Sequence, residues 1–64
     1  MYGDRHPDVA IDLSNIGSAW DALGDPKKAI EYFYQAYDIF RDTVGDEHPH
    51  TKLVKQWMDA LSVK

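Results

Sequence analysis

The stretch IGSAWDALGDPKKAIEYFYQA, residues 16–36, decides the fold, because it holds two helical patterns on either side of a short break. Gly24 predicts a left-handed cap at the end of the first helix. Asp25 predicts an N-cap and Pro26 the first position of a second helix. A connection this short makes two helices antiparallel neighbours. We therefore expect a helical hairpin around this turn.

Working outward from the turn, apolar residues recur at steps of three and four, which is the spacing of one helical face. The first helix is predicted at about 7–23, with the apolar face Ala10, Leu13, Ile16, Gly17, Trp20 and Leu23. The second is predicted at about 26–43, with the apolar face Ala29, Ile30, Phe33, Ala36, Tyr37 and Phe40. The third is predicted at about 49–63, with the apolar face Leu53, Val54, Trp57, Met58 and Leu61. Because the loop at Gly45 is short, the third helix should pack back on the second. The expected fold is all-α, a single unit over residues 1–64.

A short motif occurs twice in the chain. Gly3-Asp4-Arg5-His6-Pro7 recurs as Gly45-Asp46-Glu47-His48-Pro49, 42 residues later, with four of five positions identical. The chain thus contains one full period of a repeat and about half of a second.

Composition narrows the classes of partner. The chain has 64 residues, no cysteine and a net charge of −4. The basic residues form no cluster, which disfavours nucleic acid and anionic membranes as partners. No apolar run approaches the roughly 20 residues of a membrane span, and the N-terminus lacks a signal-peptide core, so we expect a cytoplasmic protein.

The residues around the turn resemble the tetratricopeptide repeat. The small and large signature positions of that family fall on Ile16, Gly17, Trp20, Ala29, Phe33 and Ala36. The 42-residue period, with His-Pro at each boundary, resembles the variety found in kinesin light chains. This resemblance covers roughly residues 6–54 and implies a protein–protein interaction scaffold. The small residues should let the two helix axes approach to the low end of the usual range, about 8–10 Å.

In that family, the inner face of the first helices binds peptides. The resemblance places the groove residues here at Ile11, Ser14, Asn15, Ser18, Asp21 and Ala22. Asn15 is the best candidate, because an amide can both donate to and accept from a peptide backbone. The positions that clamp a terminal carboxylate in some relatives hold no basic residue here, so we expect no such clamp.

The second copy of the repeat departs from the pattern. Asp59 stands at the position equivalent to Gly17, Trp57 at that of Asn15 and Ser62 at that of Trp20. The third helix is therefore not expected to serve as the first helix of a complete repeat. We expect a terminal helix that covers the hairpin, as end repeats of solenoids do.

One repeat is too small to bury both of its faces, so we predict self-association, most simply a two-fold dimer. A helix could also be exchanged by opening the turn at Gly24 or the loop at Gly45. The side chains expected at such an interface are Tyr34, Leu53, Trp57, Met58 and Leu61. Two alternatives stay open: an excised or engineered building block without a ligand, and a monomeric peptide-binding module.

Catalysis, metals and cofactors are not expected. His6 and His48 occupy equivalent repeat positions, each before a helix-starting proline, which predicts imidazoles that accept hydrogen bonds from early helix N–H groups. The carboxylates fall at turns or on outward helix faces, where nothing would push the pKa values of a catalytic pair apart. We therefore expect a non-enzyme.

Overall fold

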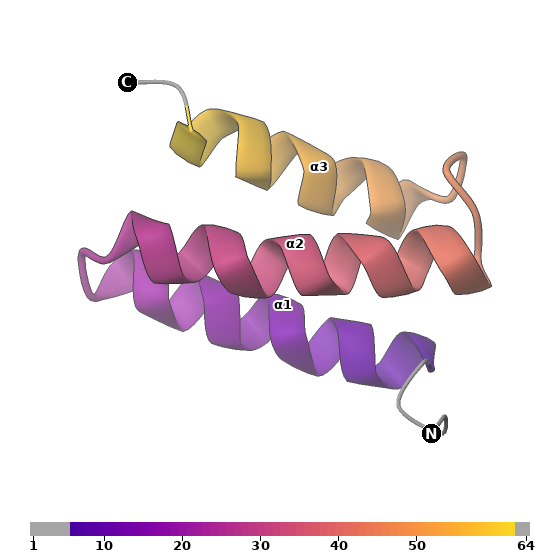
Figure 1. Cartoon of the computed structure of the whole chain (residues 1–64), viewed down its shortest axis with the longest axis horizontal. Coiled ribbons are helices and arrows are strands. Elements are labelled where there is room, and N and C mark those ends of the chain that lie inside the picture. Colours follow the sequence, from indigo (N-terminus) through magenta and orange to yellow (C-terminus); the bar gives the residue numbers. More distant parts are fainter. Residues whose placement is uncertain (1–5, 63–64) are drawn as a thin grey trace.

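The computed structural model describes residues 6–62, which form three helices. These are α1 (Pro7–Ala22), α2 (Pro26–Thr43) and α3 (Pro49–Ser62). Figure 1 shows α2 between the other two, in contact with both. The all-α hairpin with a third packed helix is thus confirmed. α1 ends one residue before the expected Leu23, and Val63, the expected end of the third helix, lies outside the described residues.

The helix starts are capped by side chains as the sequence indicates. The Lys28 backbone N–H donates to Asp25 Oδ1 at 3.2 Å. The Asp8 N–H donates to His6 Nδ1 and the His50 N–H to His48 Nδ1, each at 3.1 Å. The predicted role of the two repeat-equivalent imidazoles as local acceptors is therefore confirmed. Each of these bonds satisfies one backbone donor that has no partner inside its helix.

Glycines with positive φ end the first two helices. Gly24 has φ 87° and Gly45 has φ 94°. After the reversal, the Asp25 N–H donates to the Trp20 carbonyl at 2.9 Å, and the Gly45 N–H donates to the Phe40 carbonyl at 2.9 Å. These bonds close the carbonyl ends of α1 and α2 and turn the chain back on itself.

Small side chains set the contact between α1 and α2. Ala10 of α1 and Ala29 and Ala36 of α2 are 0% exposed. A Cβ placed on Gly17 would lie 2.9 Å from the Phe33 ring and 3.1 Å from the Ala29 carbonyl oxygen. The absence of a side chain at Gly17 is therefore what allows Phe33 to fill the space between the helices.

α3 packs its apolar side on α2 and the loop before it. Val54 and Thr51 are 2% and 1% exposed, and Thr51 Oγ1 donates to the Gly45 carbonyl at 2.8 Å. Trp57 meets Phe33 with ring centroids 5.3 Å apart. The expectation that the third helix folds back on the second is confirmed. Among the described helices, none is long and apolar enough to cross a membrane.

The expected burial of three apolar side chains is wrong. Ile16 is 41% exposed, Leu23 75% and Leu53 41%. Leu23 follows the last residue of α1 and lies in the turn that leads into α2. Ile16 and Leu53 lie at the edges of their apolar faces, and three helices leave those edges without a neighbour. The helical period correctly indicated which side of each helix is buried. It overestimated how much of the helix circumference the buried side takes up.

Candidate functional site

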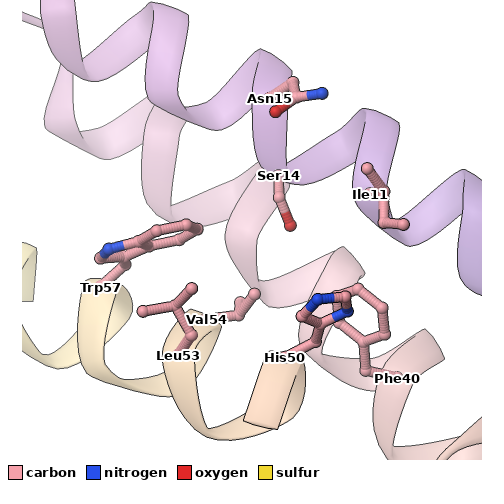
Figure 2. Close-up of a pocket in the computed structure, with 8 residues that line it drawn as sticks. All are labelled: Ile11, Ser14, Asn15, Phe40, His50, Leu53, Val54 and Trp57. Atoms are coloured by element: carbon pink, nitrogen blue, oxygen red, sulfur yellow. The ribbon is translucent and has the colours of Figure 1, made fainter.

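A hollow lies between α1 and α3, with α2 as its floor (Figure 2). Its volume is about 320 Å³. All three helices supply side chains to it: Ile11, Ser14, Asn15, Phe40, His50, Leu53, Val54 and Trp57. Because α1 and α3 both rest on α2 rather than on each other, the space between them is left open.

The lining of this hollow is mainly apolar. Ile11 of α1 and Leu53 and Trp57 of α3 form the two walls, above the Phe40 ring. Ile11 and Leu53 are 39% and 41% exposed, while Phe40 is 2% exposed. Half-exposed aliphatic walls over a buried aromatic floor can accept an apolar side chain from a partner.

Three polar side chains lie in the same hollow. Ser14 Oγ donates to the Ala10 carbonyl at 3.0 Å, so its hydroxyl proton is already used within α1. Asn15 is exposed, and its amide stands at the rim (Figure 2). The His50 ring packs against Phe40, with centroids 5.5 Å apart, and against His48 at 5.0 Å. Of the three, the Asn15 amide is the group best placed to bond with a peptide backbone.

A second hollow continues along the same side of the molecule. Its volume is about 240 Å³, and its lining is Ser18, Asp21, Phe33, Trp57, Ala60 and Leu61. Trp57 lines both hollows, so we treat them together as the α1–α3 groove. Asp21 is the one formally charged side chain in the two linings, while His48 and His50 lie near the other end. Neither lining contains a lysine or an arginine, and the expectation that the groove has no carboxylate clamp stays a prediction.

The structure brings together five of the six predicted groove residues. Ile11, Ser14 and Asn15 line the first hollow, and Ser18 and Asp21 line the second. The sixth, Ala22, is exposed and belongs to neither lining. Their part in binding a ligand stays a prediction.

The predicted self-association residues lie on α2 and α3, and their part in self-association stays a prediction. Leu53, Trp57 and Leu61 line the groove, and Trp57, Met58 and Leu61 are also packed against the core. Tyr34 lies on α2 and is 63% exposed. Sequence reasoning missed the contribution of α3 to the groove, although the apolar spacing of Leu53 and Trp57 was the signal that could have indicated it.

Among residues 6–62, no three His, Asp or Glu side chains come together in a way that could hold a metal ion. Asp46, Glu47 and Asp59 form ion pairs with Arg41, Lys52 and Lys55 at the exposed surface. The groove itself is lined mainly by apolar side chains.

Comparison with known proteins agrees with this geometry. A sequence profile described as the tetratricopeptide repeat matches residues 1–52, which is most of the chain. No curated protein and no solved structure matched it. The signature residues Gly17, Ala29 and Ala36 are all buried, and a Cβ on Gly17 would lie 3.1 Å from the Ala29 carbonyl oxygen. The chain therefore belongs to the tetratricopeptide repeat family, whose members are generally protein–protein interaction modules.

Proposed function

We propose that the chain is an interaction unit whose α1–α3 groove binds a peptide segment of another protein. The observation that carries this proposal is an open, mainly apolar groove that contains five of the six residues expected to bind a peptide. The recurrence of Gly-Asp-x-His-Pro after 42 residues further supports the kinesin-light-chain-like variety of repeat.

The groove chemistry indicates the kind of peptide. The hollow between Ile11 and Leu53 suits a leucine or an aromatic side chain as an anchor. The Asn15 amide can bond with the peptide backbone beside it. Asp21 at the other end favours a lysine or arginine, and the lack of basic residues in the linings disfavours an acidic peptide or a terminal carboxylate.

Binding by one such unit should be weak. Standard interfaces bury about 800 Å² per partner, and a strip of one repeat supplies less than that. We expect dissociation constants in the micromolar range or above for a short peptide, which fits a module that works together with neighbouring repeats.

The test is a titration of ¹⁵N-labelled protein with two synthetic peptides. One carries a single phenylalanine anchor and two lysines, and the other replaces the lysines by glutamates. The basic peptide should shift the amide signals of Asn15, Asp21 and Trp57. Leu53→Asp should abolish binding, and Asp21→Lys should reverse the preference between the peptides. Tyr34→Ala, on an exposed α2 position outside the groove, is the matched control.

Shifts confined to residues outside the groove would contradict the proposal. So would equal binding of both peptides by the wild type and by Leu53→Asp, because the anchor and its charge preference would then have no effect.

Self-association is the second candidate. Tyr34 and Leu53 present large side chains that are 63% and 41% exposed, which supports a contact between copies of the chain. A two-fold dimer, with or without exchange of a helix at the Gly24 turn or the Gly45 loop, would cover such side chains. Light scattering should then give the mass of a dimer that Tyr34→Asp reduces. The mass of one chain from micromolar to near-millimolar concentration would exclude this candidate.

A further inference from the structure

The start of α3 has a histidine where the equivalent start of α1 has an aspartate. In both, the imidazole before the helix-starting proline accepts a backbone hydrogen bond. The Asp8 N–H donates to His6 Nδ1 and the His50 N–H donates to His48 Nδ1, each at 3.1 Å. His6 and His48 are 42 residues apart, and so are Asp8 and His50. The imidazole that caps α1 therefore has a carboxylate as its neighbour, whereas the one that caps α3 has a second imidazole.

The hydrogen bonds at the two helix starts depend on the protonation of these rings. An imidazole can accept at Nδ1 only while that nitrogen carries no proton. The imidazole is also the side chain whose charge ordinarily changes between about pH 5 and 8. Protonation at Nδ1 would remove the acceptor and place a positive charge at the positive end of the helix dipole. Both helix starts share this cost, so the neighbour that meets the new charge decides how they differ.

That neighbour compensates for the charge at α1 and adds to it at α3. Asp8 Oδ2 lies 3.8 Å from His6 Nδ1, so a protonated His6 has a carboxylate beside it. The His48 and His50 rings lie 5.0 Å apart between centroids, so two protonated rings there would repel each other. His50 also packs against the Phe40 ring of α2 at 5.5 Å, and Phe40 is 2% exposed. The cost of protonation thus falls on the contact between α3 and α2.

The charged side chains that flank the two histidines in sequence are already paired with one another. Arg41 Nε lies 3.7 Å from Asp46 Oδ1, and Lys52 Nζ lies 3.2 Å from Glu47 Oε1. On the α2 side, the ring that meets His50 is that of Phe40. From α1, three uncharged side chains line the hollow that His50 shares: Ile11, Ser14 and Asn15. The protonated pair would therefore face neutral side chains from α1 and an apolar ring from α2.

We propose that the His48–His50 pair is an acid-sensitive switch that loosens the packing of α3 on α2 and leaves the start of α1 in place. Protonation costs more in the folded chain than in the unfolded one, so the unfolded chain binds more protons and stability falls as the pH falls. Thr51, directly after the pair, is 1% exposed and donates to the Gly45 carbonyl, so the loss reaches a buried contact of α3. The proposal does not depend on peptide binding in the groove.

The experiment compares the 64-residue chain at about pH 7.5 and about pH 5.5, on either side of the ordinary histidine range. The wild type should melt several degrees lower at the acidic pH. Amide protection, corrected for the intrinsic pH dependence of exchange, should fall several-fold at Thr51 and Val54 and change little in α1. His50→Asp gives α3 the neighbour that α1 has and should remove most of both changes. Asp8→His is the reciprocal variant and should make the first turn of α1 lose protection in acid.

His50→Phe is the matched control for folding, because it keeps a ring against Phe40 and cannot be protonated. Its melting temperature should fall less in acid than that of the wild type, since the repulsion between the rings is gone. The same fall in the wild type, His50→Asp and His50→Phe would overturn the proposal, because the pair would then not be its cause. A wild type that melts at one temperature at both pH values would overturn it too, as would an equal loss of protection in α1 and α3.

Discussion

The Phe33 ring of α2 fills the space that a side chain on Gly17 of α1 would need. A Cβ on Gly17 would lie 2.9 Å from both Cδ1 and Cε1 of Phe33. The ring cannot easily move away, because Phe33 is 3% exposed and packs against Trp57 at 5.3 Å between centroids. One missing methyl group in α1 thus determines the position of an aromatic ring that supports both α1 and α3.

Gly17→Ala should destabilise the protein, although alanine is the better helix former. Helix propensity alone would favour alanine by about 1 kcal/mol. Overpacking of a well-filled contact costs about 1–3 kcal/mol. We expect the second effect to dominate, because the Ala29 carbonyl, 3.1 Å away, belongs to backbone that cannot rotate aside. Urea unfolding measures the difference. Ser18→Ala, at the next and exposed position, should change the free energy of unfolding little.

Gly24→Ala should also destabilise the protein, but through its backbone and not through packing. Gly24 has φ 87°, and a Cβ there would meet nothing within 4 Å. An L-residue in the left-handed region costs about 1–2 kcal/mol. A chemically synthesised chain with D-alanine at position 24 separates the two causes. It should be at least as stable as the wild type, because D-alanine prefers positive φ and restricts the unfolded chain. A loss of stability with D-alanine would point to a steric cause instead.

The helices and the close contact of the hairpin could be predicted from particular residues. Gly24, Asp25 and Pro26 indicate a turn through local chemistry, and Gly17 and Ala29 indicate a close approach through size alone. The groove was predicted on α1 only, from the family resemblance. Its second wall depends on where α3 lies across α2, which is a long-range relation that no local spacing contains. For the same reason the exposure of Ile16 was not foreseen, since helical periodicity does not say how many neighbours a face has.

Thr51→Val should destabilise the packing of α3 on α2. Thr51 Oγ1 donates to the Gly45 carbonyl at 2.8 Å, and the side chain is 1% exposed. Valine keeps the shape but removes the donor, which costs about 1 kcal/mol for a typical hydrogen bond. Amide hydrogen exchange should show faster opening in α3 than in α1. Thr43→Val is the control, because the Thr43 hydroxyl bonds only within α2, to the Ile39 carbonyl, and the residue is exposed. An equal acceleration of amide hydrogen exchange in all three helices would mean that the hydrogen bond does not specifically stabilise the packing of α3 on α2.

Trp57 should report groove occupancy by its fluorescence. It lines both hollows of the groove and is partly exposed. The other tryptophan, Trp20, lies on α1 under the Lys28 ammonium group, 5.6 Å from the ring centroid, and lines neither hollow. In Trp20→Phe, excitation at a wavelength that tyrosine does not absorb gives emission from Trp57 alone. The basic peptide should move this emission to shorter wavelength, because its anchor would displace water from the indole. When Leu53→Asp is added to this variant, the peptide should no longer shift the emission. The emission spectrum without peptide should change little on adding Leu53→Asp. A shift that survives Leu53→Asp would place the peptide elsewhere on the molecule.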